Sequence, residues 1–221
     1  MNVLVVAPHP DDDVIGCGGS IALHRSLGHN VHVVYMTSGD AGSIKIPKKT
    51  LGDVREKEAL AALRVLDVSQ YTFFRLPDGY VSTDDNVLKR FIELIRETKP
   101  NVIYIPHEAD AHRDHKRTHK IVAEAVRRAA YEAFQECKGK PWSVGTVLCY
   151  EVWTPIQSVT YVEDISPFMK KKLEALQKHA SQIAIVPYDD LVAGLNRYRG
   201  GMTGKGTYCE CFKILRAERV F

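Results

Sequence analysis

A short segment near the N-terminus carries side chains that could do chemistry together. Residues 8–13 read PHPDDD and so hold one imidazole and three carboxylates. One aspartate before a helix can accept hydrogen bonds from free backbone N–H groups, but three adjacent carboxylates repel one another unless a cation or a proton lies among them. His9 and Asp12, on a loop stiffened by two prolines, can both reach one divalent metal ion and leave Asp11 free as a base. The segment therefore predicts a metal site.

A second cluster, residues 107–115, reads HEADAHRDH and is followed by His119. His112 and His115, with an aspartate between them, form its tightest part. Neutral imidazoles and carboxylates suit Zn²⁺, and a catalytic zinc keeps three protein ligands and one open position. Any one of these histidines alone is more typical of a charged surface loop, and His107 and His119 stay undecided. Together, the two clusters favour a site of nitrogen and oxygen ligands.

The elements that must position these clusters alternate between short apolar runs and amphipathic segments. We expect strands at 3–7, 31–36, 71–75, 102–105, 144–152, 159–162 and 208–214. We expect helices at 14–27, 55–66, 87–98, 115–136, 168–179 and 189–197. This order predicts an α/β fold, with a Rossmann-like, mostly parallel sheet between two layers of helices. Ligands of such sheets bind at the carboxyl ends of the strands, which is where both clusters begin.

The two clusters also resemble the motifs of a known family. Residues 8–12 (PHPDD) and 112–115 (HRDH) are similar to the A-H-P-D-D-E and H-P-D-H motifs of the LmbE-like, or N-acetylglucosaminyl-phosphatidylinositol de-N-acetylase-like (PIG-L), zinc hydrolases. The resemblance extends to residues 37–42 (TSGDAG), 55–59 (REKEA) and 76–79 (LPDG). It covers about the first 120 residues well and the remainder loosely.

This resemblance implies roles for five residues of the two clusters. One zinc ion per chain would be bound by His9, Asp12 and His115. Asp11 would be the general base for water at the metal. His112 would stabilise the oxyanion or protonate the leaving amine.

The same resemblance implies that Arg55 and Asp78 hold sugar hydroxyls. Two departures from the family pattern stand out. Asp13 replaces the usual glutamate, which we expect to be tolerated because this residue is not a ligand. Some members place a tyrosine just before the second motif, where this chain has alanine and arginine around His112; this leaves open what assists the oxyanion.

Two glycine-rich segments have less specific sequences. Residues 16–19 (GCGG) follow the first strand, but the preceding aspartates would repel a pyrophosphate and argue against a dinucleotide site. Residues 194–206 are glycine-rich and basic, which fits either a mobile surface loop or a lid or anchor that brings Arg197, Arg199 or Tyr198 to a sugar or an anionic aglycone. Tyr150, Glu151 and Trp153, at the end of the fifth expected strand, are further candidates to line the pocket.

Length and composition are those of an ordinary globular protein. The 221 residues are 45% hydrophobic and 26% charged, with a net charge of +3, which indicates neither nucleic-acid binding nor membrane insertion. We expect one domain over 1–221, in which 1–150 forms the sheet core with the metal site and 151–221 faces the substrate. Five scattered cysteines and a first apolar run too short for a secretory signal favour a cytoplasmic protein. A homo-oligomer is left open.

The function that these observations favour is hydrolysis of an amide. We expect a zinc-dependent enzyme that removes the N-acetyl group from an N-acetylglucosamine-type sugar or glycoconjugate, a small-molecule substrate. Two alternatives remain: a metal-dependent hydrolase of another amide or ester bond, and a non-catalytic domain that binds a sugar or a nucleotide.

Overall fold

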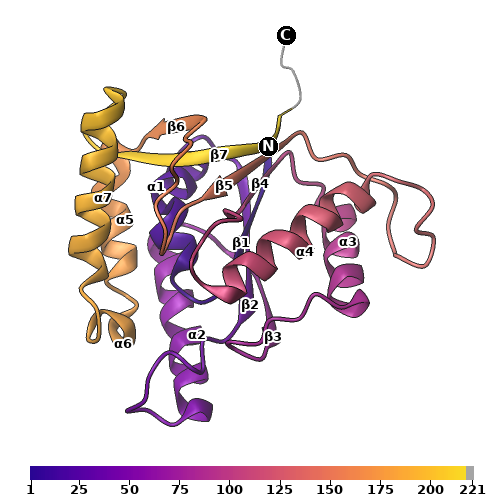
Figure 1. Cartoon of the computed structure of the whole chain (residues 1–221), viewed down its shortest axis with the longest axis horizontal. Coiled ribbons are helices and arrows are strands. Elements are labelled where there is room, and N and C mark those ends of the chain that lie inside the picture. The colour runs from indigo at the N-terminus through magenta and orange to yellow at the C-terminus, as the bar shows by residue number, and fades with distance from the viewer. Residues whose placement is uncertain (218–221) are drawn as a thin grey trace.

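A computed structural model describes residues 1–217 of the chain (Figure 1). Within these residues seven strands form one sheet in the order β3-β2-β1-β4-β5-β7-β6. The strands are β1 (Asn2–Ala7), β2 (Asn30–Thr37), β3 (Gln70–Leu76), β4 (Val102–Pro106), β5 (Thr146–Tyr150), β6 (Tyr161–Asp164) and β7 (Cys209–Ala217). The first five pair in parallel, whereas β7 pairs antiparallel with both β5 and β6. The predicted mostly parallel sheet is confirmed.

The helices lie in two layers, one on each face of the sheet (Figure 1). They are α1 (Asp12–Ser26), α2 (Lys48–Val65), α3 (Asp85–Thr98), α4 (Arg113–Ala129), α5 (Met169–Leu176), α6 (Ala180–Ile183) and α7 (Tyr188–Thr203), with a 3₁₀ turn at Ser166–Phe168. Helices α1, α2 and α5 share one apolar core with the sheet, and α3 and α4 share the other. Along β1, Val3 and Val5 face the first core while Leu4 and Val6 face the second. From Val3 to Ala7 this strand is therefore apolar at every position, as a strand buried between two layers of helices is expected to be.

The expected long helix 115–136 is wrong at its C-terminal end, because α4 stops at Ala129. The buried guanidinium of Arg96, on α3, donates hydrogen bonds to the carbonyls of Ala129, Tyr131, Phe134 and Cys137 at 2.7–3.3 Å. These bonds satisfy the carbonyl groups that a longer helix would have paired internally. The side chain that ends the helix thus lies more than thirty residues away in sequence.

The glycine-rich segment 194–206 is mostly helical, because α7 continues to Thr203. Gly200 lies on the side of α7 that meets the chain before β7, where a Cβ atom would come within 2.4 Å of the Thr207 carbonyl oxygen. Gly204 then ends the helix with a left-handed backbone, at φ 65°. Although the glycine content of residues 194–206 is typical of a loop, Gly200 allows close packing of the helix and Gly204 ends it.

The GCGG segment also serves packing. Helix α1 bends at Cys17, and the backbone N–H groups of Gly19 and Ser20 each donate to the Glu210 carboxylate of β7 at 2.8 Å. Lys172 of α5 forms an ion pair with the same carboxylate at 2.7 Å, and both charged groups are fully buried. A Cβ atom at Gly19 would lie 2.6 Å from Ile165. The C-terminal elements therefore pack directly on the helix that begins at the aspartate cluster.

Within residues 1–217, no helix combines the length and the apolar character that crossing a bilayer requires.

Candidate active site

Both ionisable clusters lie at the same edge of the sheet. The loop after β1 carries His9, and the loop after β4 carries His112 and His115, the last of these in the first turn of α4. Because β1 and β4 are neighbours in the sheet, their loops emerge side by side. The ring centroid of His9 lies 4.8 Å from that of His112 and 5.4 Å from that of His115. The structure thus brings together the residues that the two motifs single out.

Asp12 lies between two of these imidazoles. Its Oδ2 atom is 3.1 Å from Nδ1 of His9 and 3.2 Å from Nε2 of His115. All three side chains are buried, and neither ring nitrogen of His115 has a hydrogen-bond partner among the described residues. Two buried imidazole nitrogens directed at one carboxylate oxygen form a donor set that fits a divalent ion such as zinc. Two imidazole nitrogens and one carboxylate oxygen are ligands that suit an ion with tetrahedral coordination, such as zinc.

The pKa values of His115 and Asp12 indicate that the carboxylates around the imidazoles favour positive charge at this point. Burial lowers the pKa of His115, but Asp12 and Asp110 outweigh it and raise the pKa to about 9. Burial alone would raise the pKa of Asp12, yet His115 and His9 hold it well below its usual range. The carboxylate therefore stays ionised, which is the form that binds a metal ion.

A second layer of carboxylates stands behind the histidines. Oδ1 of Asp110 lies 3.4 Å from Nδ1 of His115, while Oδ1 of Asp78 and Oδ2 of Asp114 lie 3.1 and 3.4 Å from Nε2 of His9. Carboxylates in this position orient metal-binding imidazoles and fix their tautomers. Sequence reasoning assigned no role to Asp110 or Asp114. Their signal was present in the HEADAHRDH run, where acids alternate with histidines.

Asp11 differs from the other aspartates in its backbone. It has φ 122°, a conformation that costs a non-glycine residue on the order of 1–3 kcal/mol. Its carboxylate lines the cavity at this edge of the sheet and lies 3.1 Å from Nη2 of Arg55. Burial raises the pKa of Asp11 to about 7, even though Arg55 lowers it. Asp13, in contrast, faces the protein interior, where it accepts a hydrogen bond from Tyr35 at 2.8 Å.

Arg55 joins the two loops on the β1 and β2 side of the site. Its guanidinium donates to the carbonyl of Pro10 at 2.6 Å and to that of Gly39 at 3.1 Å, in addition to pairing with Asp11. It also lines the cavity, as does Asp78, whose second oxygen accepts the N–H of Ala41 at 2.8 Å. The predicted contacts of Arg55 and Asp78 with sugar hydroxyls stay predictions. Both residues already hold parts of the site in place.

His112 caps the N-terminus of α4. Its Nδ1 accepts a hydrogen bond from the backbone N–H of Asp114 at 3.2 Å, so the remaining ring proton is assigned to Nε2. Burial lowers the pKa of His112, as do the nearby His9 and His115. The ring is therefore neutral and offers one N–H donor to the cavity that it lines.

Arg197 and Tyr198 do not reach this cavity. Both lie on α7, where Arg197 donates to the carbonyl of Thr207 at 3.2 Å and Tyr198 is 59% exposed. Neither side chain is among those that line the cavity. Their predicted contact with the substrate stays a prediction that this structure does not support by proximity.

The cavity at the site has a volume of about 630 Å³ and two distinct ends. The metal-site end is lined by His9, Asp11, Asp12, Arg55, Asp78 and His112. The outer end includes Ile44, Trp153, Ile185 and Tyr188. Gln182, Ile185 and Tyr188 were missed from the sequence, because no local pattern shows that the segment after α5 folds over this edge.

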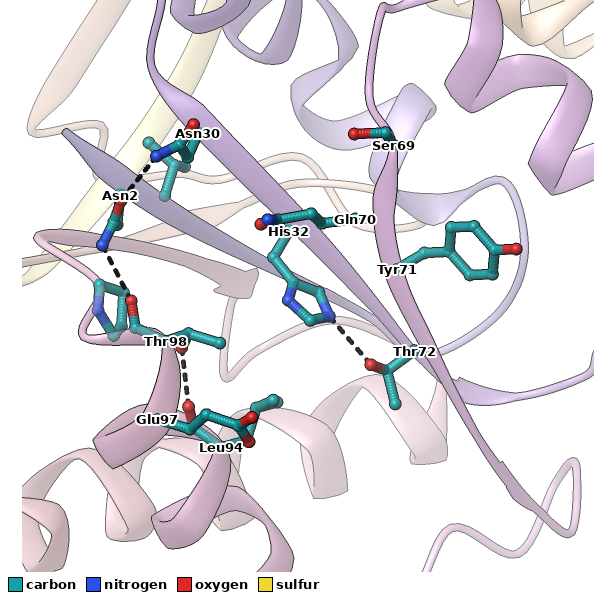
Figure 2. A pocket seen from close by; sticks show the side chains of 12 residues that line it. Asn2, Asn30, His32, Ser69, Gln70, Tyr71, Thr72, Leu94, Glu97 and Thr98 are labelled. Atoms are coloured by element: carbon teal, nitrogen blue, oxygen red, sulfur yellow. Dashed lines mark hydrogen bonds between the residues drawn. The ribbon is translucent and has the colours of Figure 1, made fainter. Parts of the chain in front are cut away.

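A second cavity, of about 810 Å³, lies at the amino ends of the strands, where Figure 2 shows its lining. Its polar groups are mostly paired with one another: Nε2 of His32 lies 2.9 Å from Oγ1 of Thr72, and the Asn2 side chain donates to the carbonyl of Thr98 at 3.0 Å. None of the predicted site residues lines it. This cavity is larger, but the chemistry lies at the opposite edge of the sheet.

The sequence is also similar to that of a family of enzymes, in keeping with the geometry of the site at the carboxyl ends of the strands. Residues 4–126 match the profile of the family described as GlcNAc-PI de-N-acetylase. The chain belongs to this family. A curated relative in this group, 1D-myo-inositol 2-acetamido-2-deoxy-α-D-glucopyranoside deacetylase of Rhodococcus jostii, is 27% identical over 84% of this chain and 82% of its own length.

Solved structures of de-N-acetylase-like proteins share the whole fold. N,N′-diacetylchitobiose deacetylase from Pyrococcus horikoshii superposes with a TM-score of 0.87 at 26% identity, covering 97% of this chain and 83% of that one. The 4-carboxy-2-hydroxymuconate hydratase from Pseudomonas putida superposes with a TM-score of 0.85 at 25% identity, covering 100% and 98%. The same fold therefore occurs in a deacetylase and in a hydratase, so the reaction of this chain has to be inferred from the residues of its site and not from the fold.

Proposed function

We propose that this member of the de-N-acetylase family is a zinc-dependent hydrolase that removes the N-acetyl group from an N-acetylglucosamine-type sugar or glycoconjugate. The observation that carries this proposal is the Asp12 oxygen shared by the His9 and His115 nitrogens, at 3.1 and 3.2 Å, with the Asp11 carboxylate next to it in sequence and in the cavity. A ligand set and a separate carboxylate are the two components that metal-assisted hydrolysis requires.

The residues that would hold the metal are His9, Asp12 and His115. Bound there, zinc would polarise the amide carbonyl and make a water molecule acidic near neutral pH. Asp110 and Asp114 would keep the two imidazoles in the tautomers that face the metal, because their carboxylates lie behind the rings. Since this set includes both N and O donors, zinc is the ion proposed.

Asp11 would accept the proton of the attacking water. It is the one carboxylate of the first cluster that lines the cavity without facing an imidazole of the ligand set; its charged partner is Arg55. The guanidinium and the unusual backbone hold it in place, so no reorientation would precede proton transfer. Asp11 could then pass the proton on to the leaving amine.

His112 would act on the oxygen side of the reaction. Because the backbone N–H of Asp114 donates to Nδ1 of His112, the ring offers an Nε2–H to the cavity. A donor fixed in this way stabilises negative charge that develops on a carbonyl oxygen. Of the two roles implied by the family resemblance, we therefore favour the oxyanion partner over the proton donor to the amine.

The whole chain would work as one unit, with residues 1–150 supplying the metal site. Residues after 150 supply Trp153, Gln182, Ile185 and Tyr188 to the cavity, which supports the proposal that this part faces the substrate. The proposed compartment is the cytoplasm, in keeping with five free, buried cysteines. A homo-oligomer stays an open proposal.

The test is a metal analysis combined with an assay for acetate and free amine. Methyl glycosides of N-acetylglucosamine and related glycoconjugates serve as substrates, with and without one equivalent of zinc. We expect acetate and amine in equal amounts and only with metal. Stoichiometric zinc without acetate from any of these substrates would contradict the proposal. Hydration of a substrate such as that named for the structurally similar hydratase would then become the better account.

A further inference from the structure

We propose that the outer end of the active-site cavity is an apolar subsite, and that the substrate is an N-acetylglucosaminide whose aglycone presents an apolar or aromatic surface. This inference rests on the proposed deacetylase function and names the substrate class for the same site. The subsite is formed by Ile44, Trp153, Ile185 and Tyr188.

The cavity changes character from its inner to its outer end. Every carboxylate that lines it, namely Asp11, Asp12 and Asp78, belongs to the metal-site end. At the outer end Ile44 is fully exposed, and Ile185 and Trp153 are 53% and 50% exposed. Exposure of large apolar side chains to water is unfavourable, so a ligand that covers these side chains gains binding free energy.

Trp153 is held rigidly although its side chain is exposed. Its backbone N–H donates to Oδ2 of Asp110 at 3.0 Å, and the N–H of Thr154 donates to the same oxygen at 3.3 Å. The carbonyl of Thr154 lies 2.7 Å from Nε2 of His107. Because Asp110 also lies behind His115, the backbone of Trp153 is fixed relative to the metal-site end. An aromatic side chain on a fixed backbone has only two side-chain torsions to order, so it binds a flat group with little loss of entropy.

Tyr188 extends this surface. Its ring meets that of Trp153 edge to face, with centroids 5.9 Å apart and planes at 77°. The two rings come from different parts of the chain, the loop after β5 and the start of α7, and meet at the cavity. The single cation at this end among the lining residues is Lys45, whose exposed, flexible side chain can keep its ammonium in water. The geometry therefore favours an apolar aglycone over an anionic one.

The experiment compares kcat/KM for three glycosides of N-acetylglucosamine, with methyl, phenyl and carboxymethyl aglycones, by acetate release from the zinc-loaded protein. We expect the phenyl glycoside to exceed both others by about tenfold, the effect of filling an apolar pocket. Trp153→Ala should lower the phenyl-to-methyl ratio to near one, and Trp153→Phe should keep most of it. Tyr131→Ala, which removes an exposed aromatic ring away from the cavity, should keep the wild-type ratio.

Three results would overturn the inference. The first is equal kcat/KM for the phenyl and methyl glycosides. The second is a preference for the carboxymethyl glycoside, which would assign the outer end to an anion. The third is an unchanged ratio in Trp153→Ala. Each of these results includes acetate release and so leaves the deacetylase function intact, whereas no release from any of the three glycosides would contradict the function and the inference together.

Discussion

Oδ1 of Asp110 lies 3.4 Å from Nδ1 of His115, on the side of the imidazole opposite Asp12. The carboxylate also accepts the backbone N–H of His112 at 2.8 Å and that of Trp153 at 3.0 Å. One buried aspartate therefore links a proposed metal ligand, the proposed oxyanion partner and the proposed aglycone surface. A substitution at Asp110 should therefore affect the positions of His115, His112 and Trp153.

Replacing Asp110 by asparagine is expected to weaken zinc binding by about 10–100-fold, because the amide no longer fixes the tautomer of His115 by its charge. Competition with a chromophoric chelator measures this affinity. Asp190→Asn, at an exposed position in the first turn of α7, provides the matched control and should bind zinc like the wild type. Equal affinity in all three proteins would show that Asp110 does not support the metal site.

His112 and His115 should respond differently to truncation. His115→Ala removes a proposed ligand and should abolish stoichiometric zinc binding. His112→Ala should keep the metal and lower kcat by about 10²–10³-fold, the usual cost of removing one oxyanion donor. The measurements are zinc content after dialysis and the rate of acetate release. Loss of zinc from His112→Ala would instead make His112 a ligand, which its distance from His9 and His115 allows.

The buried pair Lys172–Glu210 should matter for stability. Both groups are fully buried, and Glu210 also accepts the N–H groups of Gly19 and Ser20, so Glu210→Gln leaves a buried ammonium unpaired. We expect a loss of about 3–5 kcal/mol in the free energy of unfolding, measured in urea. Lys171→Met breaks the exposed pair with Asp67 and should cost no more than about 1 kcal/mol. Similar losses in the two variants would contradict this account.

The stability of the protein should fall as the solution becomes more acidic, in part through His24. Burial, with smaller contributions from neighbouring His29 and the N-terminal ammonium, lowers the pKa of His24 from the usual 6.5 to about 4. Between pH 6.5 and 4 the unfolded chain binds a proton here that the folded chain does not, so stability rises with pH across this window and is lost on acidification. The contribution is on the order of 1–3 kcal/mol. Unfolding free energies of the wild type and His24→Gln across this range measure it, and parallel pH profiles would contradict the assignment.

Much of the fold could be predicted from local sequence patterns. The apolar run at β1 and the strand–helix alternation predict a parallel sheet, and the shared edge of β1 and β4 follows from it. The ends of elements depend on distant partners instead. Helix α4 stops because Arg96 of α3 binds the carbonyls beyond it, and no residue near Ala129 signals this.

In the candidate site, too, some residues could be predicted from local sequence patterns and others depend on the fold. His9, Asp12 and His115 could be predicted to lie close together because each stands in a dense motif just after a strand, whereas their assignment as the metal ligands is what the resemblance to the family motifs implies. Ile185 and Tyr188 could not be predicted, since an isolated apolar or aromatic residue has no sequence signature until the fold brings it to the cavity. The late basic segment shows how composition can fit two structures: its glycines allow close packing of α7, and Arg197 and Tyr198 lie outside the cavity, so their predicted contact with the substrate stays a prediction.

The most direct test of the central claim is a side-by-side measurement of zinc content and acetate release for the wild type and Asp11→Asn. The substrate is the methyl glycoside of N-acetylglucosamine. Asn keeps the shape of the side chain but cannot accept the proton, so we expect one zinc per chain in both proteins and a rate about 10²–10⁴-fold lower in the variant. A variant that holds zinc and releases acetate at the wild-type rate would contradict the account.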